Sequence, residues 1–250
     1  MLIEVRQVTL AYGEFRVLDD LSVTFPSNSI VGLIGPNGAG KSTLFSVISG
    51  FIKPLKGDVR FNQQSLGAMP PQQRARTGLC RTFQVPREFR HLTVMENMLA
   101  APNDQAGESL WSLVAHRARV RAEELELKER VWKWLRFLKL ESVADQPAGA
   151  LSGGQKKLLE LGRILMLEPR CVLLDEPYAG VNPVLIEQIS DRIHELHEQG
   201  IGFVIVEHNL HMLAKLAASL VVLDRGCLLA QGEPAAVMKE ERVRNAYMGV

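Results

Sequence analysis

The sequence contains no long hydrophobic run and few cysteines. None of its apolar stretches approaches the about 20 consecutive residues needed to cross a bilayer, and Glu4 and Arg6 interrupt the N-terminus before a secretory signal could form. The 3 cysteines, Cys80, Cys171 and Cys227, are an odd and widely spaced set without metal-ligand spacing. We therefore expect a reduced protein of the cytosol, which would reach a membrane only through partners.

An excess of charge of either sign is also missing. The chain has 29 Lys and Arg against 28 Asp and Glu, a formal net charge of +1. Nothing in this balance indicates a nucleic-acid partner or an anionic membrane surface. Hydrophobic content of 46% and charged content of 23% over 250 residues are typical of a globular protein with a sizeable core, in one large or two modest domains.

A glycine-rich stretch at residues 35–43 matches the phosphate-loop pattern G-x-x-x-x-G-K-[ST] in full. It follows an apolar run, residues 29–34, that is typical of a parallel strand buried on both faces. It precedes apolar residues at helical spacing, and Gly50 stands where a glycine would end that helix. The members of the loop are Gly35, Pro36, Asn37, Gly38, Ala39, Gly40, Lys41, Ser42 and Thr43.

The chemistry of such a loop follows from its residue types. Glycines let the backbone N–H groups and the helix N-terminus converge on one point, which suits several phosphate oxygens. Lys41 would reach the β- and γ-phosphates, and the Ser42 hydroxyl would hold Mg²⁺. A chance glycine-rich turn is the alternative, but strand before and helix after favour a nucleoside triphosphatase. The loop alone does not say which kind.

Two adjacent acids, Asp175 and Glu176, end the apolar run at residues 171–174. Ligands bind beyond the carboxyl ends of strands in open α/β sheets, and two neighbouring carboxylates there call for a cation. We expect Asp175 on Mg²⁺ and Glu176 beside the γ-phosphate. Without a phosphate loop they would indicate only the end of a strand; with one, they indicate a catalytic site.

The segment Leu151–Gln155, L-S-G-G-Q, opens an apolar-periodic helix. Ser152 and Gln155 have the spacing of a capping box, so a well-capped helix start is the simplest interpretation. Gly153 and Gly154 each lower helix propensity by about 1 kcal/mol, however. Glycines at free N–H groups are easier to explain if those groups bind an anion.

Single aromatic and histidine residues carry weaker signals. Tyr12 lies in a turn between strands, where a packing role is the more frequent one. Two histidine pairs at i, i+3 spacing, His194 with His197 and His208 with His211, could in principle hold a metal. Neither pair has a third ligand nearby in sequence, and surface positions are favoured for the first pair.

Taken in order, the phosphate loop, Gln84, L-S-G-G-Q at 151–155, L-L-D-E-P at 173–177 and His208 resemble the ATP-binding cassette (ABC) ATPases of transporters over essentially the whole chain. The resemblance implies an α/β fold: a P-loop NTPase (RecA-like) core with an antiparallel β subdomain and an inserted α-helical signature subdomain. It implies a single domain over residues 1–250. The core would be 1–84 and 168–235, the helical subdomain 85–167, and the C-terminal helix 236–250.

The same resemblance assigns roles, with ATP and Mg²⁺ as cofactors. Tyr12 would stack on adenine, Gln84 would contact Mg²⁺ and the attacking water, and His208 would bond the γ-phosphate. Glu176 would polarise the water. The signature residues Ser152, Gly153, Gly154 and Gln155 would complete the nucleotide site of a second ATPase subunit, so that two copies close head to tail over two nucleotides.

Finer features resemble the high-affinity branched-chain amino-acid uptake ATPases: residues 78–84 (G-L-C-R-T-F-Q), 92–97, 179–183 and 246–249. Most cassette ATPases carry Asp at the position of Asn182. Whether Asn182 makes the cross-dimer hydrogen bond that the family makes there is therefore an open question. The resemblance implies a peripheral subunit on the cytoplasmic face of the inner membrane that powers import of branched-chain or other amino acids.

Its implied partners are a second ATPase, identical or a paralogue, two transmembrane permease subunits and, indirectly, a periplasmic solute-binding protein, with no nucleic acid. Urea or amide importers and lipopolysaccharide-export ATPases are alternatives within the family. A cassette ATPase of iron–sulfur cluster assembly, with no role in transport, is the alternative from another class.

Overall fold

The computed structural model describes residues 2–26, 28–82, 88–102, 117–207 and 209–248. Within them the chain divides into two compact units: residues 1–84, 170–179 and 193–250, and residues 85–169 and 180–192. No helix among the described residues is both long enough and apolar enough to cross a membrane. The single-domain assignment with its three sequence-based boundaries stays a prediction.

The first unit contains two sheets. A four-stranded antiparallel sheet has the order β2-β1-β4-β5, and a six-stranded sheet has the order β10-β9-β3-β8-β7-β6. The strands of the first are β1 (Leu2–Tyr12), β2 (Phe15–Pro26), β4 (Lys56–Phe61) and β5 (Gln64–Ser65). Those of the second are β3 (Ile30–Ile34), β6 (Leu79–Arg81), β7 (Cys171–Asp175), β8 (Gly202–Val206), β9 (Ser219–Asp224) and β10 (Cys227–Gly232).

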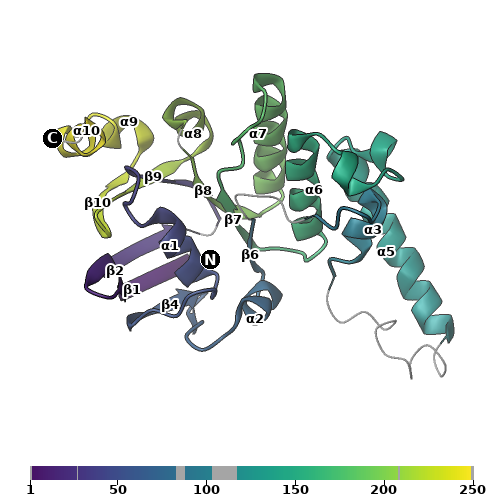
Figure 1. Cartoon of the computed structure of the whole chain (residues 1–250), viewed down its shortest axis with the longest axis horizontal. Coiled ribbons are helices and arrows are strands. Elements are labelled where there is room, and N and C mark those ends of the chain that lie inside the picture. The colour runs from purple at the N-terminus through teal and green to yellow at the C-terminus, as the bar shows by residue number, and fades with distance from the viewer. Residues whose placement is uncertain (1, 27, 83–87, 103–116, 208, 249–250) are drawn as a thin grey trace. The chain divides into compact units, whose positions relative to one another are not determined.

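The larger sheet is parallel from β6 to β9, and only β10 runs antiparallel, as a hairpin on β9. Its central strands β3, β7 and β8 are buried at every position, which is why their sequences are continuous apolar runs instead of alternating ones. Figure 1 shows β7 and β8 side by side, and β3 pairs with the other side of β8. Their carboxyl ends lie at the same edge of the sheet. The phosphate loop follows β3 there, Asp175 ends β7, and Glu176 is the next residue.

Helix α1 (Lys41–Ile48) packs into a core that draws on both sheets. Phe45 of α1, Phe25 of β2 and Leu33 of β3 are fully buried in one hydrophobic cluster. Gly50, with φ +84°, follows the helix as predicted. This unit also contains α2 (Pro71–Arg76), α8 (Leu210–Leu216), α9 (Pro234–Val237), α10 (Glu241–Met248) and the last part of α7 (Pro183–Glu198).

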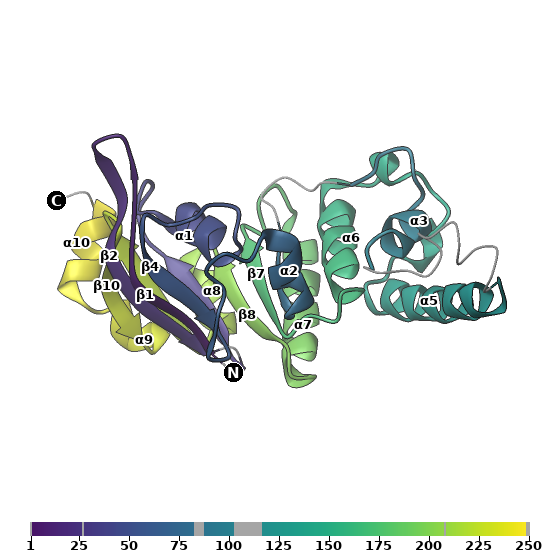
Figure 2. The same ribbon diagram turned by 90° about the horizontal axis from the view of Figure 1, so that it is seen from below.

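The second unit is helical. It holds α3 (Val94–Leu99), α5 (Arg117–Phe137), α6 (Gly153–Leu165), the 3₁₀ turns η2 (Glu141–Val143) and η3 (Ala148–Ala150), and the first part of α7 (Pro183–Glu198). Figure 2 shows α3, α5 and α6 beside one another, and they pack pairwise. Thr93 and Glu96 form a capping box that begins α3.

The mixed α/β architecture, with a parallel core and a separate antiparallel sheet, confirms the fold class that the sequence predicts.

Candidate functional site

The loop between β3 and α1 holds a buried cation. Lys41, the first residue of α1, is only 7% exposed. Its Nζ donates to the carbonyl oxygens of Gly35 at 2.7 Å and Pro36 at 3.0 Å. These two carbonyls begin the same loop, so the ammonium group is folded back across the concave side of the loop. A phosphate group entering the loop would meet this cation directly.

Gly35 is required by the close approach of a neighbouring strand. A Cβ built on Gly35 would lie 2.1 Å from the carbonyl oxygen of Leu223 in β9, and the residue has φ +151°. Backbone on both sides of this contact prevents adjustment. The first glycine of the loop is therefore set by packing against the sheet, independently of any ligand.

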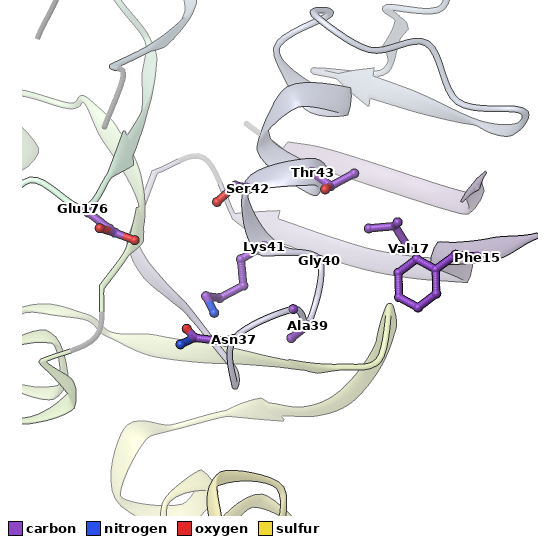
Figure 3. Close-up of a pocket in the computed structure, with 10 residues that line it drawn as sticks. Phe15, Val17, Asn37, Ala39, Gly40, Lys41, Ser42, Thr43 and Glu176 are labelled. Carbon is purple, nitrogen blue, oxygen red and sulfur yellow. The ribbon is translucent and has the colours of Figure 1, made fainter. Parts of the chain in front are cut away.

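The two predicted acids follow β7. Asp175 ends the strand, 4% exposed, and Glu176 is the next residue. Glu176 has φ +50°, an uncommon value for a residue with a side chain, and its N–H donates to Val206 O at 3.0 Å. Strain of this kind costs on the order of 1–3 kcal/mol and gathers at functional sites. Here it turns the chain so that Glu176 faces the phosphate loop (Figure 3).

A cavity of about 290 Å³ brings the phosphate loop, with Lys41, together with Glu176. Figure 3 shows the Lys41 side chain and the Glu176 carboxylate directed into the same space, with Phe15 and Val17 beyond Gly40. The cavity therefore has a cation, an acid and a ring from β2 on its walls. Its lining residues are Phe15, Val17, Asn37, Gly38, Ala39, Gly40, Lys41, Ser42, Thr43 and Glu176.

Charge around the cavity is balanced against burial. Burial lowers the pKa of the Lys41 ammonium below its ordinary value, while the carboxylates of Glu176 and Asp175 act in the opposite direction. Desolvation disfavours the charged form of a lysine, and nearby anions favour it. An anion bound in the loop would therefore offset the desolvation of Lys41, which is the larger of the two effects.

Tyr12 and Phe15 face each other across the turn that joins β1 and β2. The strand register pairs them directly. Phe15 is among the residues that line the cavity, whereas Tyr12 is 58% exposed at the end of β1 and is not one of them. The sequence analysis selected Tyr12 and missed Phe15. The signal that could have found Phe15 is that a second aromatic residue stands only three positions after Tyr12.

Sequence reasoning did not select three polar residues near the acids: Arg81 and Thr82, which contact Asp175, and Glu207, which holds the backbone two residues after Glu176. Arg81 Nη2 donates to Asp175 Oδ2 at 2.8 Å, and the Asp175 N–H donates to Thr82 Oγ1 at 3.1 Å. Glu207, which follows β8 and is 6% exposed, accepts the Tyr178 N–H at 2.7 Å. Arg81, a charged residue at the end of the otherwise apolar strand β6, was a signal that a buried partner exists.

The predicted signature residues lie in the second unit, at the start of α6. Ser152 Oγ accepts the Gln155 N–H at 3.3 Å and Gln155 Oε1 accepts the Ser152 N–H at 2.9 Å, which confirms the capping box. Both residues line a cavity of about 570 Å³ in this unit, together with Lys139 and Asn182. Asn182 Oδ1 also accepts the Leu185 N–H at 2.9 Å.

Two of the predicted catalytic residues, Gln84 and His208, lie outside the residues that the structure describes. The possible metal pair of His208 with His211 is therefore not described either. Among the described residues there is no cluster of three or more His, Cys, Asp or Glu side chains able to hold a metal. His194 Nε2 lies 3.5 Å from Glu198, and His197 Nδ1 lies 3.1 Å from Ile201 O, so each of these two histidines has its own partner.

Comparison with known proteins places this geometry in a family context. The family model described as "ABC transporter" matches residues 18–179. The chain is 37% identical to the "Probable branched-chain amino acid transport ATP-binding protein LivG" of Methanocaldococcus jannaschii, over 99% of this chain and 97% of the relative. It is 33% identical to the "High-affinity branched-chain amino acid transport ATP-binding protein LivG" of Escherichia coli K12, over 99% and 98%.

A solved structure gives the same result for the fold. An ATP-binding cassette of an ABC transporter, described in its ADP conformation, superposes with a TM-score of 0.84 at 35% identity. The superposition covers 100% of this chain and 99% of that one.

We predict that the two signature glycines differ in what they tolerate. A Cβ on Gly154 would meet the Leu185 side chain at 1.7 Å, whereas a Cβ on Gly153 has its nearest neighbour at 3.8 Å. Gly154→Ala should therefore lower the free energy of unfolding by about 1–3 kcal/mol. Gly153→Ala, the matched control, should leave it unchanged or raise it by up to about 1 kcal/mol, because alanine favours helix. Urea denaturation measures both; equal effects would contradict the packing.

Proposed function

This chain belongs to the ABC transporter family as an ATP-binding protein similar to LivG, and on that premise we propose that it hydrolyses ATP to power an inner-membrane importer of branched-chain or other amino acids. The observation that carries the proposal is the cavity in which the phosphate loop and Glu176 face one another. A loop that binds phosphates and an acid that can polarise water are the two requirements for hydrolysis.

In this proposal the phosphate loop holds the nucleotide. The backbone N–H groups between Gly35 and Thr43 and the N-terminus of α1 surround the phosphates. Lys41 exchanges its two carbonyl partners for the β- and γ-phosphate oxygens, since charge-assisted bonds to phosphate are stronger than bonds to neutral carbonyls. The adenine lies toward β2, where Phe15 lines the cavity and Tyr12 is its neighbour.

The donor set fits Mg²⁺. Ser42 and Asp175 offer hydroxyl and carboxylate oxygens, the hard ligands that this ion prefers. Magnesium characteristically keeps waters and takes phosphate oxygens in addition to one or two protein ligands, so a cluster of three protein ligands is not needed. When bound, the ion would neutralise charge on the phosphates. Asp175 is buried at the carboxyl end of β7, where Arg81 is its ion-pair partner.

Glu176 is the general base in this scheme. Its carboxylate faces the loop and accepts a proton from the water that attacks the γ-phosphorus in line. Gln84 would orient the same water and contact Mg²⁺, and His208 would bond the γ-phosphate. These last two roles rest on the family resemblance at those positions.

A second ATPase subunit completes each site. The signature residues Ser152, Gly153, Gly154 and Gln155 form the N-terminus of α6, where backbone N–H groups have no carbonyl partner within the helix, and this suits a phosphate brought by another chain. The cavity beside Ser152 and Gln155, with Lys139 on its wall, supports such a contact. The γ-phosphate would then favour the closed dimer, and hydrolysis would reopen it.

Glu176→Gln tests the catalytic role. The amide keeps the size of the side chain but cannot take a proton, so kcat for ATP should fall by about 10²–10⁴-fold while ATP affinity stays within a few-fold of wild type. In the presence of ATP, the variant should also accumulate as a dimer, which size-exclusion chromatography detects. Glu233→Gln, an exposed acid at the start of α9, is the matched control and should retain full turnover. Steady-state hydrolysis in Glu176→Gln at the wild-type rate would refute the role.

The transport role is tested by the proteins that co-purify with the chain. Tagged full-length protein purified in mild detergent from its native cells should bring down two polytopic membrane subunits and a second cassette ATPase, identical or a paralogue. The solute-binding protein of the same system should bind a branched-chain amino acid. Recovery of soluble assembly proteins alone would contradict a role in transport. A solute-binding protein specific for urea or an amide would contradict amino-acid import and indicate urea or the amide as the substrate.

A further inference from the structure

Arg81, the last residue of β6, joins two elements of the nucleotide-binding unit. Its side chain is 10% exposed. Nη2 donates to Asp175 Oδ2 on β7 at 2.8 Å, and Nη1 donates to Ser46 Oγ at 3.0 Å and Ser49 Oγ at 3.3 Å on α1 and at its C-terminal cap. The guanidinium also lies over the Phe45 ring, 5.7 Å from its centroid. One planar cation thus bridges the strand that carries the acids and the helix that follows the phosphate loop.

A comparison within the same unit separates this arrangement from ordinary packing. Arg74 is also buried, 3% exposed, and also contacts α1. Its guanidinium donates to backbone carbonyls, among them those of Val47 and Ile48 at 2.8 Å each. It closes the C-terminal end of α1, where carbonyl oxygens need donors. Arg81 pairs instead with a carboxylate, and a buried ion pair brings little stability for its cost in desolvation.

The bridge leads from one proposed metal ligand to the other. Ser46, one turn after Ser42 on α1, donates its hydroxyl to the Ser42 carbonyl at 2.8 Å. Arg81 bonds Ser46 with one nitrogen and Asp175 with another. The backbone N–H of Asp175 is held separately by Thr82 Oγ1. The hydroxyl ligand and the carboxylate ligand are therefore tied to each other through Arg81.

We propose that Arg81 is a positioning residue for Mg²⁺: it holds Asp175 by Oδ2, leaves Oδ1 to the metal, and keeps that carboxylate in register with Ser42. This inference rests on the proposed nucleotide site and adds a residue to it. Partners of a ligand that fix its orientation characteristically change metal affinity by about 10–100-fold when removed. Arg81 therefore sets how strongly Mg²⁺ promotes nucleotide binding, and leaves the metal-free binding of nucleotide to the phosphate loop.

Arg81→Lys is the variant of choice. Lysine preserves the charge beside Asp175, so it avoids the buried unpaired carboxylate that Arg81→Met would leave. A single ammonium group lacks the fork that reaches Asp175 and the serines together. Arg74→Lys is the matched control, since it makes the same exchange at a buried arginine that contacts the same helix. Ser46→Ala is a second variant that removes one end of the bridge without touching the ion pair.

The measurement is the dissociation constant of a fluorescent ATP analogue for the full chain, once with Mg²⁺ and once with EDTA, with thermal melting to follow folding. In Arg81→Lys the ratio of the EDTA constant to the Mg²⁺ constant should fall by about tenfold or more relative to wild type. The EDTA constant itself should stay within about twofold. Ser46→Ala should shift the ratio in the same direction by less, and Arg74→Lys should not shift it.

Other results are equally decisive. An unchanged ratio in Arg81→Lys, or an equal loss of affinity in Mg²⁺ and in EDTA, would overturn the positioning role while leaving the proposed function intact. The positioning role is likewise overturned if Arg74→Lys lowers the ratio as much as Arg81→Lys does. Wild-type protein that fails to bind the analogue, or binds it without any response to Mg²⁺, would instead contradict the proposed site itself.

Discussion

The buried ammonium group of Lys41 is the constraint on which the rest of the site depends. It lies inside the phosphate loop, where the carbonyl oxygens of Gly35 and Pro36 are its hydrogen-bond acceptors. Carbonyl dipoles offset only part of the cost of removing such a cation from water. Burial accordingly lowers the pKa of Lys41 in spite of the carboxylates nearby. A loop built in this way is poised to exchange dipoles for the full charges of a phosphate group.

The sheet places the acids at the same edge. Strands β3, β8 and β7 are parallel neighbours, so their carboxyl ends lie together, and Asp175 stands in register with Val206. Glu176, the next residue, has a left-handed backbone conformation, and its carboxylate faces the loop. The second buried cation, Arg81, pairs with Asp175. Lys41 and Glu176 thus line one cavity, and the adjacent Asp175 is paired with Arg81. Removing one partner of that buried ion pair would leave an unpaired charge, which is costly.

Much of this could be predicted from local sequence. Several of these features depend on short patterns that the structure confirms: the strand, loop and helix around residues 35–43, the capping box of Ser152 and Gln155, and the position of Asp175 at a strand end. Such features were predictable because the residues that determine them are neighbours in the chain. The antiparallel sheet and the helical segment were expected from the family resemblance.

The remaining features depend on contacts between distant segments. Arg81 and Asp175 are 94 positions apart and meet only because β6 pairs with β7. The left-handed φ of Glu176 and the presence of Phe15 in the cavity wall likewise follow from how strands are placed, which no short pattern encodes. The roles of Gln84 and His208 stay predictions, since both residues lie outside the described part of the chain.

Lys41 and the phosphate loop are proposed to recognise the outer phosphates of an adenine nucleotide, and the rest of the mechanism depends on that recognition. Isothermal titration of the full chain with ATP, ADP and AMP tests it most directly. Because AMP has only the α-phosphate, it lacks the groups that Lys41 would bond, and charge-assisted bonds are worth about 1.5–3 kcal/mol each. We therefore expect AMP to bind at least about tenfold more weakly than ADP and ATP. Equal affinity for all three nucleotides would contradict this recognition.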